Sequence, residues 1–301
     1  MSTPATSPAT LAEKLQRIDR RILWLILLIV VAAPTIVPVT VPNAIMPMSR
    51  DLWKTVDACP SNKIILLSST WSNGTRGENK GQLDALLHHV MSKRIRFGLS
   101  SFTPEGSRVA LDRIKDLARR YNYVYGTDWV SFGYQPSSTN YIKGINADLI
   151  ATVKRDAIDK QPLNTLKVMR GISSIDNVHM VVELSASGSH MGWVQFLKPE
   201  VNLGFCPTSV MVPEALPYYA SGQLKGLLWG AKGAYDYEQL NVENLPPAEL
   251  AKVGLKPEDL YGTGRRYMGP LSAAFALVIL SIAVGNIAMF IGKRQAQKGD
   301  A

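Results

Sequence analysis

Polar side chains follow the ends of several predicted strands, and they are the residues best suited to chemistry. Thr70 follows a first strand, Asp128 a short third one, Ser187 and His190 a fourth, and Thr208 the last. In open parallel sheets, ligands bind beyond the carboxyl ends of the strands, where helix N-termini also favour anions. These five residues are therefore candidate ligand-binding residues. The alternative is that the serine and threonine side chains act as ordinary helix caps and turn residues.

A glycine-containing loop after the first predicted strand is a second place where an anion could bind. The segment TWSNGTRGENKGQ contains Gly74, Gly77 and Gly81, and Arg76 adds a positive charge. Glycine-rich loops bind phosphate through backbone N–H groups, but this segment matches neither GxGxxG nor GxxxxGK[ST]. Arg76 joins the candidate ligand-binding residues, with a plain solvent-exposed loop as the alternative.

Nucleophilic catalysis needs a serine or cysteine next to an oriented base. Ser187 or Cys206 could be combined with His190 and Asp128, but the sequence contains no GxSxG motif. We assign no catalytic residue, and we expect binding rather than enzymatic activity.

Metal and disulfide chemistry are not expected either. His88 and His89 are adjacent, so on a helix they point to different sides, one exposed and one half-buried, and the other histidines lack ligand spacing. Cys59 precedes the first predicted strand and Cys206 ends the last, which places them roughly 20 Å apart across the sheet. A disulfide needs Cα atoms within about 7 Å. We expect no bridge, no metal and no cofactor.

Three glycines near the end of the domain share a spacing of four residues. Gly222, Gly226 and Gly230 would lie on one face of a helix predicted from residue 222 to residue 240. Glycine costs about 1 kcal/mol relative to alanine in a helix, so a close contact must compensate. A protein partner could supply that contact, with Trp229 and Tyr235 as partner-binding residues. The alternative is packing inside the domain.

Alternating strands and helices must position all of these residues. An apolar run of strand length begins at Lys63, and a helix with one apolar stripe follows a capping box formed by Asn79 and Gln82. Thr103 and Pro104 begin a second helix. This alternation predicts a Rossmann-like three-layer α/β domain with a mostly parallel sheet. The predicted strands cover residues 63–69, 95–101, 123–126, 178–187 and 201–206.

Two uncharged apolar segments flank the domain, at residues 22–41 and 268–292. Each is long enough as a helix to cross a hydrocarbon core of about 30 Å. In the second segment, Ser281 and Gly285 form a small-xxx-small pair, typical of helix contacts in membranes. The expected order is a cytoplasmic tail (1–21), a transmembrane helix (22–42), a proline-containing stalk (43–62), the α/β domain (63–243), a linker (244–266), a second transmembrane helix (267–292) and a basic cytoplasmic tail (293–301).

The charge pattern favours one orientation in the membrane. Four basic residues precede the first segment, and basic residues favour the cytoplasmic side, so both tails are expected in the cytoplasm and the domain outside. The reversed orientation and a cleaved signal peptide are the alternatives. The net charge of +9 is spread along the chain without a dense basic block, so nucleic-acid binding is not expected.

These features favour a two-pass protein of the plasma or inner membrane. We expect its α/β domain to act as a binding or scaffold subunit of a membrane assembly, with the lipid bilayer and a protein partner or second copy as partners. The alternative function is a membrane-tethered enzyme or small-anion binder that uses the polar rim of the sheet.

Overall fold

The structure, a computed structural model, describes residues 19–37 and 39–299. It contains two compact units. One consists of residues 42–265, and the other combines the described residues up to Val41 with those from Arg266 onward. The first unit holds the α/β domain and extends beyond the expected range of 63–243.

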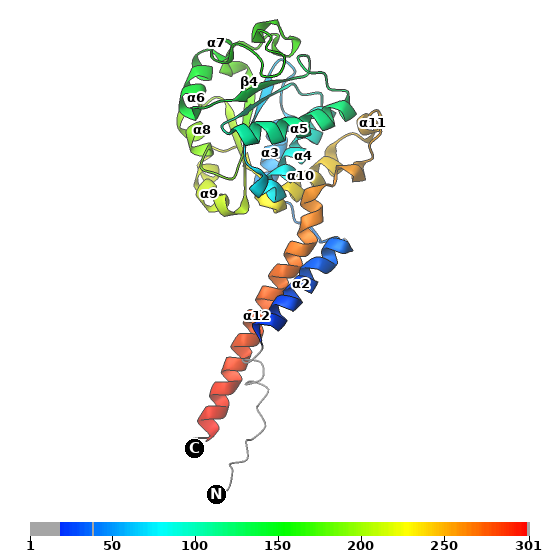
Figure 1. The fold of residues 1–301 in the computed structure, drawn as a ribbon, viewed down its shortest axis with the longest axis vertical. Helices are drawn as coiled ribbons and strands as arrows, with labels where there is room; N and C mark the ends of the chain where they lie inside the picture. The colour runs from blue at the N-terminus through cyan, green and yellow to red at the C-terminus, as the bar shows by residue number, and fades with distance from the viewer. Residues whose placement is uncertain (1–18, 38, 300–301) are drawn as a thin grey trace. The chain divides into compact units, whose positions relative to one another are not determined.

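The larger unit is built on one sheet in which every pair of neighbouring strands is parallel (Figure 1). The strand order is β3-β2-β1-β4-β5-β6, which is the order of doubly wound Rossmann sheets. The expected α/β fold with a parallel sheet is therefore confirmed. The strands are β1 (Ile64–Thr70), β2 (Phe97–Ser101), β3 (Trp129–Tyr134), β4 (Val178–Ser185), β5 (Asn202–Pro207) and β6 (Gly226–Leu227).

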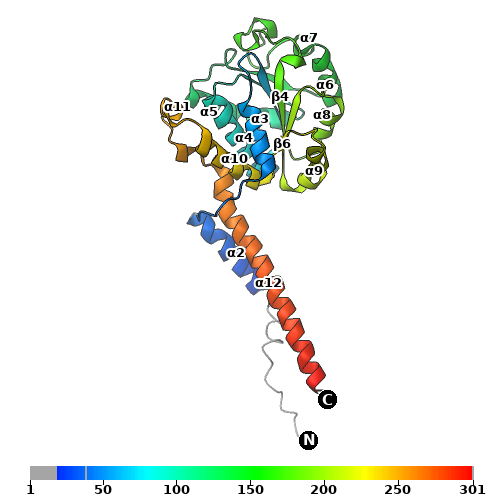
Figure 2. The ribbon, with the colours of Figure 1, turned by 180° about the vertical axis from the view of Figure 1, so that it is seen from behind.

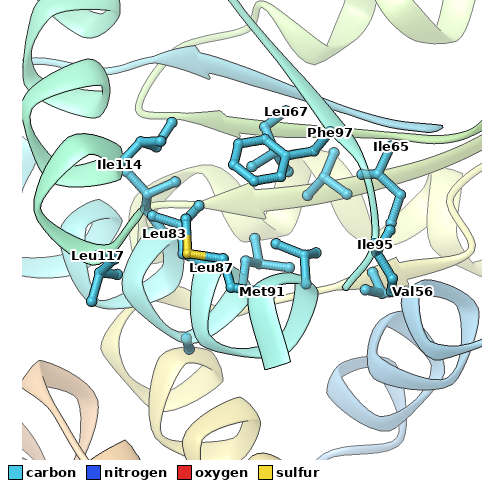
Figure 3. Packing of buried hydrophobic residues seen from close by; sticks show 14 of the residues in the cluster. Val56, Ile65, Leu67, Leu83, Leu87, Met91, Ile95, Phe97, Ile114 and Leu117 are labelled. Carbon is cyan, nitrogen blue, oxygen red and sulfur yellow. The ribbon is translucent and has the colours of Figure 1, made fainter. Parts of the chain in front are cut away.

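Two hydrophobic clusters cover the two faces of the sheet. Because successive strand residues point to opposite faces, Ile65 and Leu67 belong to one cluster, and Ile64 and Leu66 to the other. Figure 3 shows the first cluster, where Phe97 and Leu67 meet side chains of the neighbouring helices. Its helices are α3 (Pro47–Asp57), α4 (Arg76–Ser92), α5 (Pro104–Tyr121) and α10 (Gly230–Asn244). The second cluster is completed by α6 (Ser138–Ala147), α7 (Leu149–Val153), α8 (His190–Phe196) and α9 (Val212–Ala220).

The third strand lies elsewhere than predicted. Residues 123–126 contribute only an isolated bridge between Tyr125 and Trp129, and β3 begins only at Trp129. Gly126, with φ of +73°, lies in a turn before the strand begins. The segment WVSFGY is buried along most of its length, as is typical of a strand in a sheet covered on both faces.

Local signals predicted one helix start correctly and the other incorrectly. Thr103 caps α5 and accepts a hydrogen bond from the N–H of Gly106 at 3.1 Å, as expected. Helix α4 begins at Arg76, so Asn79 and Gln82 are not its capping box. Both are buried, and the amide of Gln82 donates to the carbonyls of Pro207 and Leu228. Long-range hydrogen bonds thus explain these polar residues.

The expected stalk is part of the domain. Helix α3 buries Leu52, Trp53 and Val56 in the first cluster (Figure 3 labels Val56). A side chain at Gly226 would lie 2.3 Å from the backbone nitrogen of Leu52, so this glycine allows α3 to approach β6. Pro47 is the first residue of α3, a position where proline is tolerated, so the proline-containing segment leads into the core rather than forming a stalk.

The predicted helix from 222 to 240 is also corrected. Gly226 lies in β6, and α10 begins only at Gly230, which has a φ of +49°. The three glycines therefore do not share a helical face. The spacing of four residues does not reflect a helix here. Gly222 and Gly230 have positive φ angles, and Gly226 allows the close approach of Leu52.

The expected linker after residue 243 packs onto the domain. It contains α11 (Pro247–Ala251) and a 3-10 helix, η6 (Pro257–Leu260), and Leu250, Leu255 and Leu260 are buried in the first cluster. The domain thus continues to Arg265.

The smaller unit contains α2 (Arg20–Ile36) and most of α12 (Thr263–Gly299), which lie side by side (Figures 1 and 2). Among the described residues, one helix, Thr263–Lys293, is long and apolar enough to cross a membrane. Helix α2 has 17 residues, or about 25 Å, and is shorter than the predicted segment. The predicted tail after residue 292 continues α12 to Gly299, and most of the N-terminal tail lies outside the described residues.

Candidate functional site

The strand order reverses between β1 and β4, and their carboxyl ends form the edge where doubly wound sheets bind ligands. The structure brings four predicted residues to this edge. Thr70 is the last residue of β1, Ser187 follows β4, His190 begins α8, and Thr208 follows β5. Their role in binding stays a prediction.

Asp128 lies at the opposite edge of the sheet. It immediately precedes β3, and its carboxylate accepts the N–H of Val124 at 2.8 Å. The prediction placed it at a carboxyl end because it assigned the third strand to residues 123–126. Asp128 stabilises the turn before β3 and is not near the other candidates.

A chain of hydroxyl groups connects the surface at this edge to a buried carboxyl group. Ser187 is exposed, and its Oγ lies 3.0 Å from Oγ of Ser185. Oγ of Ser185 lies 2.8 Å from that of Ser189, which lies 2.5 Å from Oε1 of Glu183. The indole N–H of Trp193 donates to Oε2 of Glu183 at 2.9 Å. We call Ser187, Ser185, Ser189 and Glu183 the hydroxyl chain.

Glu183 was missed in the sequence, although a signal was present. It is a charged residue inside VHMVVELS, an apolar run whose length indicated burial on both faces. The side chain is fully buried, and burial raises its pKa to about 7, against the lowering effect of the hydroxyls of Ser189, Ser68 and Thr70 and of Trp193.

The combination of Cys206 with His190 and Asp128, which the sequence allowed without a catalytic assignment, does not form. His190 stacks on Phe205 in the second cluster, with ring centroids 4.3 Å apart, whereas Cys206 belongs to the first cluster on the other face. Burial raises the pKa of the Cys206 thiol and lowers that of His190, although Glu214 opposes the latter shift. Neither ring nitrogen of His190 has a hydrogen-bond partner among the described residues.

Arg76 lines a cavity of about 380 Å³ between α4 and α5. It shares this cavity with Arg108, and both guanidinium groups are exposed without an ion pair or hydrogen bond among the described residues. Trp71 also lines it; its side chain is only 4% exposed, and its indole nitrogen has no partner there. We define the arginine groove by its lining residues, Trp71, Asn73, Arg76, Lys80, Arg108, Val109, Asp112, Arg113 and Asp116.

Three other charged residues that line the arginine groove form ion pairs. Lys80 and Arg113 both contact Asp84, at 2.7 and 2.5 Å, and Asp116 pairs with Arg119. Asp112 is an exposed carboxylate of the same wall. Among the described residues, Arg76 and Arg108 are therefore the cations of the groove without an ion pair, and Asp112 is its unpaired carboxylate.

The two predicted partner-binding residues are not exposed anchors. Tyr235 is 5% exposed, and its ring lies 6.2 Å from that of Tyr261. Trp229 is half-buried and packs against the second cluster. Both residues contribute to packing inside the domain, which was the alternative interpretation.

The histidines and cysteines do not form a metal site in the described part of the chain, where no group of three metal-ligating side chains occurs. His88 and His89 are both buried, which corrects the expected exposure of one of them. Nδ1 of His88 lies 2.7 Å from the hydroxyl of Tyr121, and Nδ1 of His89 lies 2.8 Å from that of Tyr237. Cys59 and Cys206 are free.

Comparisons of the chain with protein-family models, with curated proteins and with solved structures found no match.

Proposed function

We propose that this protein is a membrane-anchored binding protein whose α/β domain takes up a small anion in the arginine groove. The observation that carries the proposal is the pair of guanidinium groups, Arg76 and Arg108, that line one cavity and form no ion pair among the described residues. Guanidinium groups match carboxylate and phosphate oxygens in a planar, bidentate geometry. A ligand with two or more anionic oxygens could engage both side chains.

The size and position of the groove support this function. A volume of about 380 Å³ falls within the range of small-molecule sites. Trp71 and Asn73 follow β1, so the groove lies at the carboxyl end of the central strand, where doubly wound sheets bind ligands. Arg76 is the first residue of a 17-residue helix, whose N-terminus favours negative charge.

Anion titration of the full-length protein in detergent tests the proposal. The probes are inorganic phosphate, pyrophosphate and citrate, followed by calorimetry and by the shift in Tm. We expect R76A and R108A each to weaken binding at least about tenfold, because each removes a charged hydrogen-bond donor. Arg120 lies on α5 outside the groove and is exposed, so R120A is the matched control and should bind normally.

Two results would contradict this function. One is equal binding by the wild type and the R76A/R108A double variant. The other is the absence of any Tm shift in the wild type with millimolar concentrations of all three probes.

We also propose the two-pass topology, with both tails in the cytoplasm. Helix α12 is long enough to span, and α2 is apolar and has no buried residue. The apolar sequence continues beyond α2 to Val41, which adds length to its 17 residues. The basic residues before α2 favour a cytoplasmic N-terminus.

Thiol labelling of intact cells tests the topology. Ser173 is exposed on the domain, so S173C should react with an impermeant maleimide, whereas S7C in the N-terminal tail should react only after lysis. Burial raises the pKa of Cys59 to about 11, and Cys206 is fully buried, so the native background should be low. Labelling of S7C but not of S173C in intact cells would establish the reversed orientation.

A scaffold subunit is the second candidate function, and an apolar groove in the smaller unit favours it. The groove, of about 630 Å³, runs between α2 and α12 and includes Trp24, Leu277, Ser281 and Gly285. A side chain at Gly285 would have no neighbour within 4 Å, so a partner helix could approach closely there. G285L should then reduce co-purification of a partner or second copy, and A283L, outside the groove, should not.

A further inference from the structure

Glu183 occupies a position in the sheet where a charge is costly. It is fully buried on β4, and its register neighbours are Ser68 on β1 and Phe205 on β5. Its carboxyl group accepts hydrogen bonds from Ser189 and Trp193 but forms no ion pair among the described residues. A buried carboxyl without a cationic partner tends to keep its proton.

Several hydroxyl groups nevertheless lie where they can stabilise the ionised form. The hydroxyls of Ser189, Ser68 and Thr70 all favour the carboxylate. Oγ of Ser68 is fully buried and has no other hydrogen-bond partner among the described residues. The surroundings of Glu183 are therefore able to accommodate both protonation states.

The hydroxyl chain provides a connected path from the surface to this carboxyl group. Its oxygen–oxygen distances, from Ser187 inward, are 3.0, 2.8 and 2.5 Å, all within hydrogen-bonding range. Each serine hydroxyl can donate one hydrogen bond and accept two, so the direction of the chain can reverse.

The two directions correspond to the two states of Glu183. With the carboxylate ionised, Ser187 donates to Ser185, Ser185 to Ser189, and Ser189 to Glu183. With the carboxyl protonated, Glu183 donates to Ser189 and Ser189 to Ser185. The hydroxyl of Ser185 then donates to the carbonyl oxygen of Thr70, which lies 3.0 Å away. In both states, the hydroxyl groups of Ser185 and Ser189 each have an acceptor for their proton.

We propose that Glu183 is a proton-binding site and that the hydroxyl chain conducts protons between it and the surface. A hydronium ion donates a proton to Oγ of Ser187 and leaves as water, and the hydroxyl proton of Ser187 moves to Ser185. The protons of Ser185 and Ser189 then move one position inward, the last of them to Glu183. Each serine breaks one O–H bond and forms another, so only the carboxylate changes its charge.

Protonation of Glu183 acts on α8. Ser189 immediately precedes this helix and Trp193 lies within it, and both side chains donate to the carboxyl group. Hydrogen bonds to an ionised acceptor are roughly twice as strong as neutral ones. Release of the proton therefore tightens the attachment of α8 to the sheet, and uptake loosens it.

Other titratable groups near Glu183 do not account for such a transition. Burial lowers the pKa of His190 on α8, and the charge of Glu214 on α9 opposes this shift. Burial also raises the pKa of Tyr141 on α6 and that of Cys206 on β5. No Lys or Arg hydrogen-bonds to the carboxyl group among the described residues. Glu183 is thus the group in this region whose charge changes near neutral pH.

Fluorine NMR of the full-length protein in detergent tests the proposal. The six tryptophans are replaced by 5-fluorotryptophan, and the Trp193 signal is assigned through W193F. We expect this signal to titrate once between about pH 5 and 9 in the wild type and to stay constant in E183Q, which keeps the side-chain shape. A transition that persists in E183Q, or its absence from the wild type, would overturn the proposal.

Serine variants separate the path from the site and remain informative if E183Q fails to fold. S189A removes a hydrogen bond that favours the carboxylate, so the midpoint should rise. S185A interrupts the path, so relaxation after a pH jump should slow at least tenfold. Ser101 is a buried hydroxyl at the end of β2 that bonds to the Ser69 carbonyl instead, and S101A should change neither quantity. Unchanged relaxation in S185A would refute the conducting path.

Discussion

The carboxylate of Glu238 on α10 accepts the backbone N–H of Gly264, in the first turn of α12, at 2.8 Å. The N–H of Arg265 donates to the other carboxylate oxygen at 2.9 Å. Glu238 is 1% exposed, so the domain satisfies two free helix N–H groups with one buried side chain. This contact joins the end of the domain chain to α10.

Loss of this contact should destabilise the domain. E238A would leave two N–H groups without their acceptor, and we expect the free energy of unfolding to fall by roughly 2–4 kcal/mol. Urea unfolding of the full-length protein in detergent, followed by tryptophan fluorescence, measures the change. E238Q retains one acceptor oxygen and should lose less; equal midpoints for E238A and the wild type would contradict the prediction.

Gly226 should tolerate no side chain. In G226A, the added carbon would lie within 2.5 Å of backbone and side-chain atoms of Leu52, so α3 or β6 would have to move. We expect a destabilisation of about 3 kcal/mol or more, or failure to fold. Gly188 is exposed, and a Cβ added there would lie 4.0 Å from Oε1 of Glu214, so G188A is the control. Similar Tm values for both variants would show that α3 does not pack on β6.

Acid should weaken the domain through His88. Burial lowers its pKa from 6.5 to about 4, although Asp84 opposes the shift. Between pH 6.5 and about pH 4, His88 is protonated in the unfolded chain but neutral in the folded chain. The free energy of unfolding therefore decreases as the pH is lowered through this range. The cost is roughly 3 kcal/mol for a buried group. H88Q should flatten this slope in unfolding experiments between these pH values; an unchanged slope would exclude His88 as its source.

Glu183 should have the opposite pH dependence. Burial raises its pKa from 4.5 to about 7, so between these values the unfolded chain releases a proton that the folded chain retains. Stability therefore falls as pH rises through this range and is lower by roughly 3 kcal/mol above it. The difference in unfolding free energy between E183Q and the wild type should grow with pH from 4.5 to 7. A difference independent of pH would contradict the assignment.

The sequence by itself predicted the features that depend on short stretches of chain. Strand β1 begins with a continuous apolar run and β4 is mostly apolar, which is typical of strands buried on both faces. The cap of α5 needs only Thr103 and the residues that follow it. The alternation of these elements favours a parallel α/β sheet because parallel strands need crossover connections.

Only the tertiary structure decided which residues meet. Arg76 and Arg108 share one cavity because α4 and α5 pack side by side, and their separation of 32 residues carries no such information. Leu52 and Gly226 lie 174 positions apart, so the close approach of α3 to β6 could not be read from either segment. Glu183 was visible as a charge in an apolar run, but its hydroxyl partners depend on how the chain turns after β4. Contacts distant in sequence are determined by packing, and local patterns report only what each segment prefers.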